Sequence, residues 1–550
     1  MQHFSFPFGD PVFPLGDWHV SVQIITFENT YGLDAARSRV EETTDGWRVR
    51  ADRLMWAGGQ ESADGGATLA AARLADGDGV ALSVHAEHAE TIRCTKVILT
   101  GLPDATLLAR RWDEETIPDA GVLYQYPGYT KFGSQSTIQT PLIFLKLVSG
   151  DGYLAIRSLD ADVRCKRIAA YRHEGALTLE LIHEEAAARM TTRVDVPAWR
   201  IERTNDPAAV VRAHAAHLAE AHGLARWEER EDVPAWARDI AMVAAIHGMH
   251  WSGYIFNTYD QMLDMLRWIT ERIEGRRVLA YLPGWEGRYY WQYGDYRPEP
   301  RLGGVDGFRR LVAGAHALGV HLMPMFGANS ANTGLPNFEQ WGEPARMRSA
   351  GGHIEQGNKP DWDVSRAHDP GWQAILNPGA PTWRNRLVRQ VRALVTEYDL
   401  AGDAVFFDTS HWWQNDPVHP VYDGLRALKD ELRAGMPRLM VTGEGWYDAL
   451  GAITPVSHSH VPSRWIDEIF TPANRTFDHL SAGDPSCGST GVHERGTEPF
   501  RLGPLARHHW PTVTLVNGSI ARAPERVEWV ITQARQYAEQ FLGDSPHHGE

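Results

Sequence analysis

The hydrophobic pattern of the first two hundred residues is that of β-strands. Short apolar or alternating runs recur between turn sequences such as Asp-Gly-Asp-Gly at 76–79 and Ser-Gly-Asp-Gly at 149–152. Short runs bounded by glycine and aspartate are typical of antiparallel sandwiches. The clearest runs are residues 19–25, 80–84, 97–99, 142–145 and 177–182. We therefore predict an antiparallel β-sandwich domain over residues 1–200.

A helix is predicted directly after this region. Asp206 and Pro207 form a typical helix start, because aspartate caps the first turn and proline is tolerated there. Gly223 is expected to end the helix, and a charged stretch that closes on a proline follows at 225–234. We assign residues 201–234 to a helical linker.

From about residue 235 the pattern alternates between apolar strands and amphipathic helices. Strands are predicted at 240–246, 278–282, 320–326, 404–407 and 439–443. Five successive βα units predict a parallel sheet with helical crossovers. The chain has no GxGxxG turn and no P-loop, which favours a (β/α)8 TIM-type barrel over a doubly wound sheet. We predict this barrel over residues 235–550, with late strands at 465–470 and 512–516 and a closing helix at 525–542.

Two acidic residues end predicted buried strands, where apolar residues would otherwise be expected. Asp408 follows the run 404–407, and Glu444 follows the run 439–443. The carboxyl ends of consecutive strands meet at one mouth of a barrel, where barrel enzymes hold their reactive groups. We expect the two carboxylates to face each other, as cleavage of a glycosidic bond requires. The alternative for each acid is a structural ion pair or a helix cap.

The chemistry of acetal cleavage assigns a role to each acid. The reaction needs a proton on the departing oxygen and a nucleophile beside the anomeric carbon. Asp408, with a short side chain on a rigid strand end, suits the nucleophile. Glu444 reaches further, and desolvation by Trp446 and Tyr447 would raise its pKa, which suits the acid/base.

The loops after the predicted strands are rich in aromatic and amide side chains, although loops are usually polar. Residues 283–296 alone hold six aromatic residues. Aromatic faces suit sugar rings and amides can bind hydroxyls; packing against the first domain and ordinary turns are the alternatives. The candidate substrate-binding residues are Trp285, Tyr289, Tyr290, Trp291, Asn329, Asn332, His411, Trp412, Trp446 and Asp467.

Composition narrows the possible partners. The 550 residues exceed one ordinary domain, and the net charge of −16 argues against nucleic acid or an anionic membrane as partner. The 21 tryptophans suit a carbohydrate partner but equally suit large cores. Three scattered cysteines, no visible signal peptide and no long apolar span predict a cytoplasmic protein with free thiols. We expect no cofactor and no metal, and the sequence does not predict an oligomeric state.

Three short segments, 319–329, 404–408 and 442–446, resemble the α-amylase-like barrels. In those families an Asp after strand four is the nucleophile, a Glu after strand five is the acid/base, and the α-linkage is retained. The segments 302–319 and 381–408 are similar to the related α-N-acetylgalactosaminidase and endo-α-N-acetylgalactosaminidase families, which place a β-supersandwich before the barrel. The resemblance implies a retaining α-glycosidase of small saccharides or glycosides, with Asp408 and Glu444 in these roles.

The chain also departs from the α-amylase pattern. True α-amylases carry Arg two residues before the nucleophile, where this chain has Phe406, and His411 lies three residues after Asp408 instead of four. The third carboxylate has the candidates Asp467, Glu468 and the pair Asp478–His479. Amylase activity is therefore not expected. The sugar, the linkage and the choice between exo and endo action stay open.

Two other functions compete with a glycosidase. A metal-dependent barrel hydrolase could use His247 with His250, or His458 with His460, since histidine is a common zinc ligand. The first strand lacks the His-x-His of that class, and 25 histidines make chance pairs common. A non-catalytic sugar-binding barrel would use the two carboxylates only to bind hydroxyls.

Overall fold

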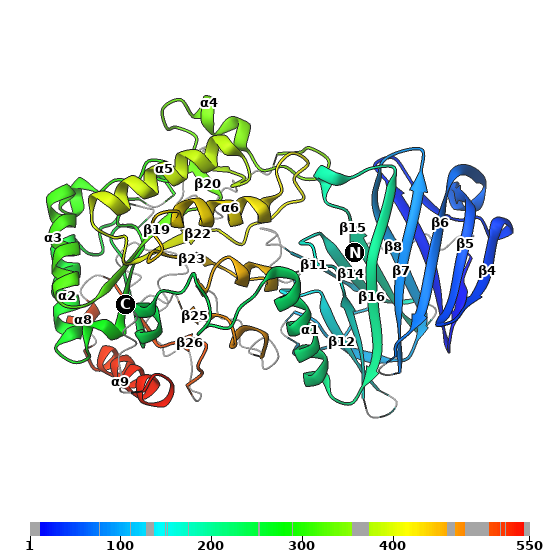
Figure 1. The fold of residues 1–550 in the computed structure, drawn as a ribbon, viewed down its shortest axis with the longest axis horizontal. Coiled ribbons are helices and arrows are strands. Elements are labelled where there is room, and N and C mark those ends of the chain that lie inside the picture. Colours follow the sequence, from blue (N-terminus) through cyan, green and yellow to red (C-terminus); the bar gives the residue numbers. More distant parts are fainter. Residues whose placement is uncertain are drawn as a thin grey trace.

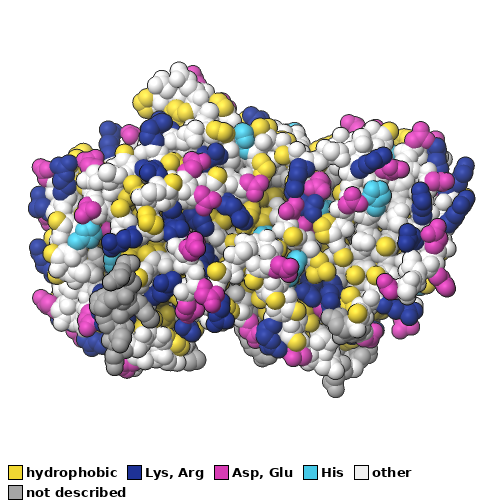
Figure 2. All heavy atoms as spheres, in the orientation of Figure 1, with side chains coloured by type: hydrophobic (Ala, Val, Ile, Leu, Met, Phe, Trp, Pro, Cys, Tyr) yellow, Lys and Arg dark blue, Asp and Glu magenta, His cyan; other side chains and the backbone are white. Residues whose placement is uncertain are grey.

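The computed structural model places two domains side by side, with a helix where they meet (Figure 1). It describes residues 11–75, 78–110, 112–127, 137–148, 150, 152–173, 175–250, 253–288, 290–354, 373–458, 468–478, 505–516, 519–522 and 524–543. On the face drawn in Figure 2, positive and negative side chains are interspersed over both domains, and the outline is notched where the domains meet.

The N-terminal domain is an antiparallel sheet, as the alternating pattern predicts. In the described part of the chain its strands follow one hydrogen-bonded path, β10-β9-β12-β13-β16-β7-β6-β5-β3-β2-β8-β15-β14-β11, with β1 on β2 and β4 on β5. The strands are β1 Phe13–Leu15, β2 Trp18–Thr26, β3 Thr30–Leu33, β4 Ser38–Thr43, β5 Gly46–Trp56, β6 Glu61–Arg73, β7 Gly79–His88, β8 Ile92–Leu102, β9 Ala105–Leu108, β10 Glu114–Glu115, β11 Val122–Tyr126, β12 Leu142–Leu147, β13 Tyr153–Ser158, β14 Lys166–His173, β15 Ala176–Glu184 and β16 Arg193–Thr204.

The two layers of the predicted sandwich are the two halves of this one sheet. Strands β7 and β16 belong to one half of the path, yet both contact β8 of the other half. Inward-facing residues of both halves, such as Val22, Leu69, Val84 and Leu99, are at most 3% exposed and share one core. A sheet that folds over itself buries one face of each half.

The predicted helix joins this domain to the second. Helix α1 (Pro207–His222) begins after Asp206, whose side chain accepts a hydrogen bond from the Ala209 N–H. It ends at Gly223, whose φ of 66° lies in the left-handed region that glycine adopts without strain.

The second domain is a parallel barrel. Its strands run in the order β17 (Met242–Ile246), β18 (Val278–Leu282), β19 (His321–Gly327), β22 (Ala404–Asp408), β23 (Met440–Glu444), β24 (Val456–His458) and β25 (Arg475–Phe477). Strands β26 (His509–Trp510) and β27 (Thr512–Leu515) are separated only by Pro511. They pair with β25 and β17 respectively, so together they act as the eighth strand and close the barrel.

Helices cover the outside of the barrel (Figure 1). They are α2 Tyr259–Thr270, α3 Gly304–Ala317, α4 Phe338–Trp341, α5 Pro381–Glu397, α6 Val421–Arg433, α8 Ser519–Arg522 and α9 Pro524–Phe541, and a two-stranded sheet of β20 (Ser330–Asn332) and β21 (Gln373–Ile375) lies in a connection. Helix α9 confirms the predicted closing helix. The predicted strand at 465–470 is wrong where the structure describes it, because residues 468–470 are helical. No helix in the described residues has the length and apolar character needed to span a bilayer.

Candidate active site

Asp408 and Glu444 are the last residues of the fourth and fifth barrel strands. Strands β22 and β23 pair in parallel, with Phe406 opposite Thr442 and Phe407 opposite Gly443. The next residue of each strand is therefore an acid, at the same mouth of the barrel. Asp408 is 8% exposed, while the side chain of Glu444 is 27% exposed. Asp408 thus lies deeper, and Glu444 lies closer to solvent.

The two carboxyl groups are hydrogen-bonded to each other. Burial, followed by the charge of Glu444 and this hydrogen bond, raises the pKa of Asp408 well above its ordinary range. Burial also raises the pKa of Glu444, while the hydrogen bonds from Asp408 and from the backbone of Thr409 oppose this rise. Two carboxyl groups this close cannot both ionise readily, so the pair keeps one proton to higher pH than an isolated acid would.

The three residues after Asp408 hold Glu444 in place. The Thr409 N–H donates to Oε2 of Glu444 at 2.8 Å, and the Ser410 hydroxyl donates to the Glu444 carbonyl at 2.9 Å. Nδ1 of His411 lies 3.0 Å from the same carbonyl. Burial lowers the pKa of His411 to about 4, so its imidazole is neutral and Nδ1 donates its proton to the carbonyl.

The backbone is strained at Thr409, where these contacts are made. Thr409 has a φ of 61°, an uncommon conformation for a β-branched residue. Gly445 has a φ of 71°, and a side-chain carbon there would lie 2.2 Å from Cγ of His411. A strained residue such as Thr409 is typical of a site that over-determines the backbone, whereas Gly445 adopts its φ without strain. Here they bring the loops after β22 and β23 into direct contact.

Tyr293 binds the other side of Asp408. Its hydroxyl donates to Oδ2 of Asp408 at 2.5 Å, and the ring of Tyr290 packs edge-on against it with centroids 5.3 Å apart. Burial and the charge of Asp408 raise the pKa of Tyr293 well above its ordinary value, so the phenol stays protonated and donates. Tyr293 belongs to the aromatic loop, but strand-end reasoning did not single it out.

Glu286 is a further buried carboxyl beside the pair. It follows strand β18, is 1% exposed, and neither of its carboxyl oxygens has a hydrogen-bond partner in the described structure. Burial raises its pKa well above the ordinary value; the nearby backbone N–H of Glu286 itself opposes this rise, and the charges of Asp408 and Glu299 add to it. In the sequence, Glu286 could have been found as an acidic residue in the loop after an apolar strand. The search for acids at strand ends missed it because Glu286 lies four residues beyond the strand.

The structure places two of the candidate tryptophans in packed interiors. Trp285 is fully buried, stacks on Phe308 and donates from its indole N–H to the Met325 carbonyl at 2.9 Å. It therefore packs as a core residue and does not line the mouth. Trp446 is 8% exposed and packs edge-on against Phe470. It belongs to a cluster with residues of the N-terminal domain.

The two asparagines differ in their surroundings. Asn332 donates to the Trp291 carbonyl and accepts from the Gly334 N–H, as a turn residue does. Asn329 donates to the Trp412 carbonyl at 3.2 Å, and its side-chain oxygen is buried without a hydrogen-bond partner in the described structure. Asn329 thus orders the loop after Asp408 and keeps an acceptor for another group.

The remaining candidates are distributed as follows. Tyr289, Asp467, His460, His479 and Cys487 lie outside the described residues. Glu468 pairs with Arg212, and Asp478 pairs with His509. Within the described ranges, no three His, Cys, Asp or Glu side chains are grouped so that they could hold a metal ion. Cys94 and Cys165 are buried free thiols.

Solved glycosidase structures share this two-domain fold. The GalNAc complex of α-N-acetylgalactosaminidase NagBb from Bifidobacterium bifidum is similar over 96% of this chain and 93% of its own, with a TM-score of 0.65 and 13% identity. The GH36 α-galactosidase AgaA from Geobacillus stearothermophilus is similar over 96% of this chain and 76% of its own, with a TM-score of 0.52 and 12% identity. No protein-family model and no curated protein matches the sequence. The likeness confirms the predicted sandwich-plus-barrel fold.

The shared proton makes a testable contribution to stability. Because the pKa of Asp408 is raised on folding, the folded chain keeps a proton that the unfolded chain loses above the ordinary aspartate value of 3.8. The free energy of unfolding of the wild type therefore falls as pH rises above 3.8 toward the raised pKa of Asp408 in the folded chain. Asp408→Asn cannot titrate and mimics the protonated carboxyl, so its melting temperature relative to wild type should rise between about pH 4 and pH 7. Thermal unfolding at both pH values measures this; a difference that does not change with pH would contradict the shared proton.

Proposed function

We propose that the protein is a retaining α-glycosidase, with Asp408 as nucleophile and Glu444 as acid/base. The observation that most supports this proposal is the pair of contacting carboxyl groups at the mouth of a barrel. A retaining mechanism needs two carboxyl groups only about 5–5.5 Å apart, and carboxyl groups in contact can reach this separation by small side-chain rotations.

One proton transfer would prepare both residues for the reaction. The pKa of Asp408 is the more strongly raised of the two, which favours the proton on Asp408 in the free protein, whereas catalysis needs Asp408 ionised and Glu444 protonated. Transfer of that proton from the Asp408 carboxyl to the Glu444 carboxylate supplies both states without a proton from solvent. A substrate that enters between the two groups would separate them, and the hydroxyl of Tyr293 would stabilise the Asp408 carboxylate.

The chemical steps then follow from these positions. Asp408 attacks the anomeric carbon while Glu444 gives its proton to the departing glycosidic oxygen, which leaves a glycosyl ester on Asp408. Glu444, now a carboxylate, takes a proton from water, whose oxygen attacks the anomeric carbon and releases Asp408. The greater exposure of Glu444 suits its contact with the leaving group and with water.

The substrate we propose is an α-N-acetylgalactosaminide, with an α-galactoside as the second candidate. The solved α-N-acetylgalactosaminidase matches this chain over nearly its whole length, whereas the α-galactosidase is covered to 76%. Glu286 supports a polyhydroxylated ligand of either kind, because its two unpartnered oxygens could accept hydrogen bonds from neighbouring hydroxyls. Asn329 offers a further unpartnered acceptor.

Substitution of each catalytic acid should have a different signature. Asp408→Asn should lose about a thousandfold or more in kcat on every α-glycoside, because no ester can form. Glu444→Gln should lose about 10²–10⁴-fold with alkyl glycosides but far less with dinitrophenyl glycosides, whose leaving group needs no proton. Steady-state kinetics on α-GalNAc and α-Gal glycosides of both kinds measures this. Equal losses of Glu444→Gln on both leaving groups would rule out its acid role.

Glu286 should contribute to substrate recognition. Glu286→Gln replaces one of the two carboxyl oxygens with an NH2 group that cannot accept, and leaving a buried hydroxyl donor of the sugar unsatisfied costs about 1–3 kcal/mol. We expect kcat/KM to fall about 10- to 100-fold, with a matching loss of affinity for the monosaccharide product. Glu299→Gln is the matched control, because Glu299 lies in the same loop but is already paired with Arg301 at 2.6 Å. Equal effects of the two substitutions would remove Glu286 from the sugar site.

A further inference from the structure

The loops that carry the two catalytic acids both reach the N-terminal domain. The loop after β22 spans residues 409–420 and includes Asn415, and the loop after β23 leads through residues 445–447 to Asp448. Asn415 is 7% exposed and Asp448 is 1% exposed. Both are polar residues buried where the two domains meet.

Asp448 is bound almost entirely by groups outside the barrel. The Tyr126 hydroxyl donates to its Oδ1 at 2.5 Å, and the Thr140 hydroxyl donates to its Oδ2 at 2.8 Å. Its backbone N–H donates to the Gln139 carbonyl at 2.8 Å. Nε2 of His214, on helix α1, lies 3.6 Å from the same carboxylate.

These partners keep Asp448 ionised. Burial raises its pKa, but the interactions with His214 and the hydrogen bond from Tyr126 outweigh burial, so the pKa lies below the ordinary value. A buried carboxylate that loses its donors becomes strongly unfavourable. The position of Asp448 is therefore tied to the N-terminal domain.

Asn415 is anchored in the same way. Its amide N–H groups donate to Oε1 of Glu184 and to the Glu185 carbonyl, both at 2.8 Å. Its side-chain oxygen accepts from the Ala187 N–H at 2.7 Å. Glu184 is the last residue of strand β15 of the N-terminal domain, and Glu185 and Ala187 follow it. Among the residues that the structure describes, the side chain of Asn415 therefore has three partners, and none belongs to the barrel.

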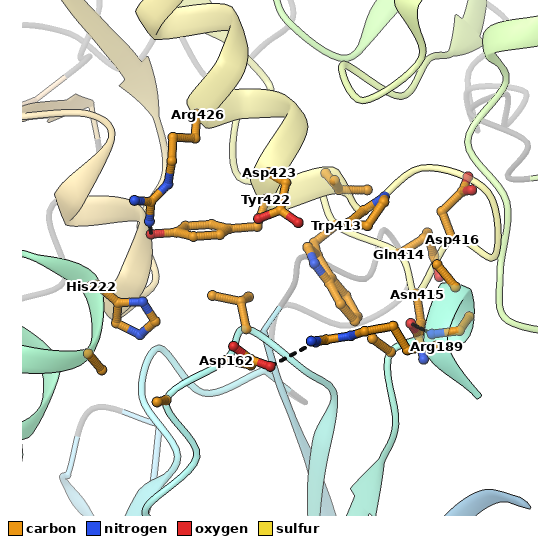
Figure 3. Close-up of a pocket in the computed structure, with 18 residues that line it drawn as sticks. Asp162, Arg189, His222, Trp413, Gln414, Asn415, Asp416, Tyr422, Asp423 and Arg426 are labelled. Atoms are coloured by element: carbon orange, nitrogen blue, oxygen red, sulfur yellow. Dashed lines mark hydrogen bonds and ion pairs between the residues drawn. The ribbon is translucent and has the colours of Figure 1, made fainter. Parts of the chain in front are cut away.

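Packing between the two domains is interrupted beside Asn415. A cavity of about 270 Å³ lies there, lined by residues of both domains that include Asp162, Arg189, His222, Trp413 and Tyr422 (Figure 3). Asn415 lies at its edge, in the loop that also carries Trp413 (Figure 3). The cavity leaves the Asn415 side of the loop less closely packed, and there the three hydrogen bonds of Asn415 hold it to the N-terminal domain.

We propose that Asp448 and Asn415 are positioning residues through which the N-terminal domain holds the two catalytic carboxyl groups in register. Asp448 acts on Glu444 through three intervening residues, of which Tyr447 packs its ring against Tyr126. A shift of this segment would weaken the bond from the Thr409 N–H to Glu444. The effect on catalysis rests on the proposed function, while the anchoring itself does not.

The test compares Asp448→Asn with substitutions of its partner Thr140, which lies outside the barrel. Asp448→Asn and Thr140→Val should lower kcat about 10-fold or more and change KM less than about threefold, while Thr140→Ser keeps wild-type values. The Thr409 N–H lowers the pKa of Glu444, so a weakened bond should move the basic limb of the kcat/KM profile to higher pH. Hydrogen exchange should also become faster in residues 409–416 and 445–450 of Asp448→Asn and Thr140→Val.

Asp403→Asn is the matched control for loss of a buried carboxylate. Asp403 is 1% exposed and lies just before the other end of β22, where it accepts from the Leu322 N–H and contacts His316 and His321. This variant should lose stability but keep kcat per folded molecule and the pH profile. Wild-type kcat and wild-type loop exchange in Thr140→Val, or an equal loss of kcat in Asp403→Asn, would overturn the proposal. If the wild-type protein is inactive on every α-glycoside, and the loops of Asp448→Asn and Thr140→Val still exchange faster than those of the wild type, the proposed function is refuted and the anchoring stands.

Discussion

Contact between two buried carboxyl groups is the constraint on which the rest of the site depends. Asp408 and Glu444 can lie side by side only if one proton remains between them, and burial raises the pKa of both. Such an arrangement costs stability unless other groups satisfy the remaining oxygens. Tyr293 satisfies Asp408 and the Thr409 N–H satisfies Glu444, so the pair is held by groups on two barrel loops.

The fold supplies this contact in stages. Parallel pairing of β22 and β23 puts the two acids at adjacent strand ends, and the left-handed backbone at Thr409 and Gly445 turns the following loops toward each other. Hydrogen bonds from the N-terminal domain to Asp448 and Asn415 then reach the same two loops from outside. Catalytic groups held by strand ends, tight turns and a second domain are positioned more precisely than groups on loops alone.

Local pattern was enough to predict the barrel and the central acids. An acid at the end of an apolar strand needs only local sequence and the rule that parallel strands end at one mouth. Burial was harder to predict: Trp285 lies in an aromatic loop, yet it packs against Phe308 as part of the core. The strand predicted at 512–516 is confirmed as β27, but the pattern did not show its short other half, β26, from which Pro511 separates it. The bond between Tyr126 and Asp448 joins residues 322 positions apart and leaves no local pattern.

The roles of the two acids can be separated by azide rescue, with the anomeric configuration of the product read by NMR. In Asp408→Gly, azide would enter the space of the missing nucleophile and attack the face opposite the leaving group, which gives a β-glycosyl azide from an α-glycoside. In Glu444→Ala with a dinitrophenyl glycoside, the ester on Asp408 would form and azide would replace water, which gives an α-glycosyl azide. We expect these two products. The reverse configurations, or no azide product from either variant, would contradict the assignment of Asp408 as nucleophile and Glu444 as acid/base.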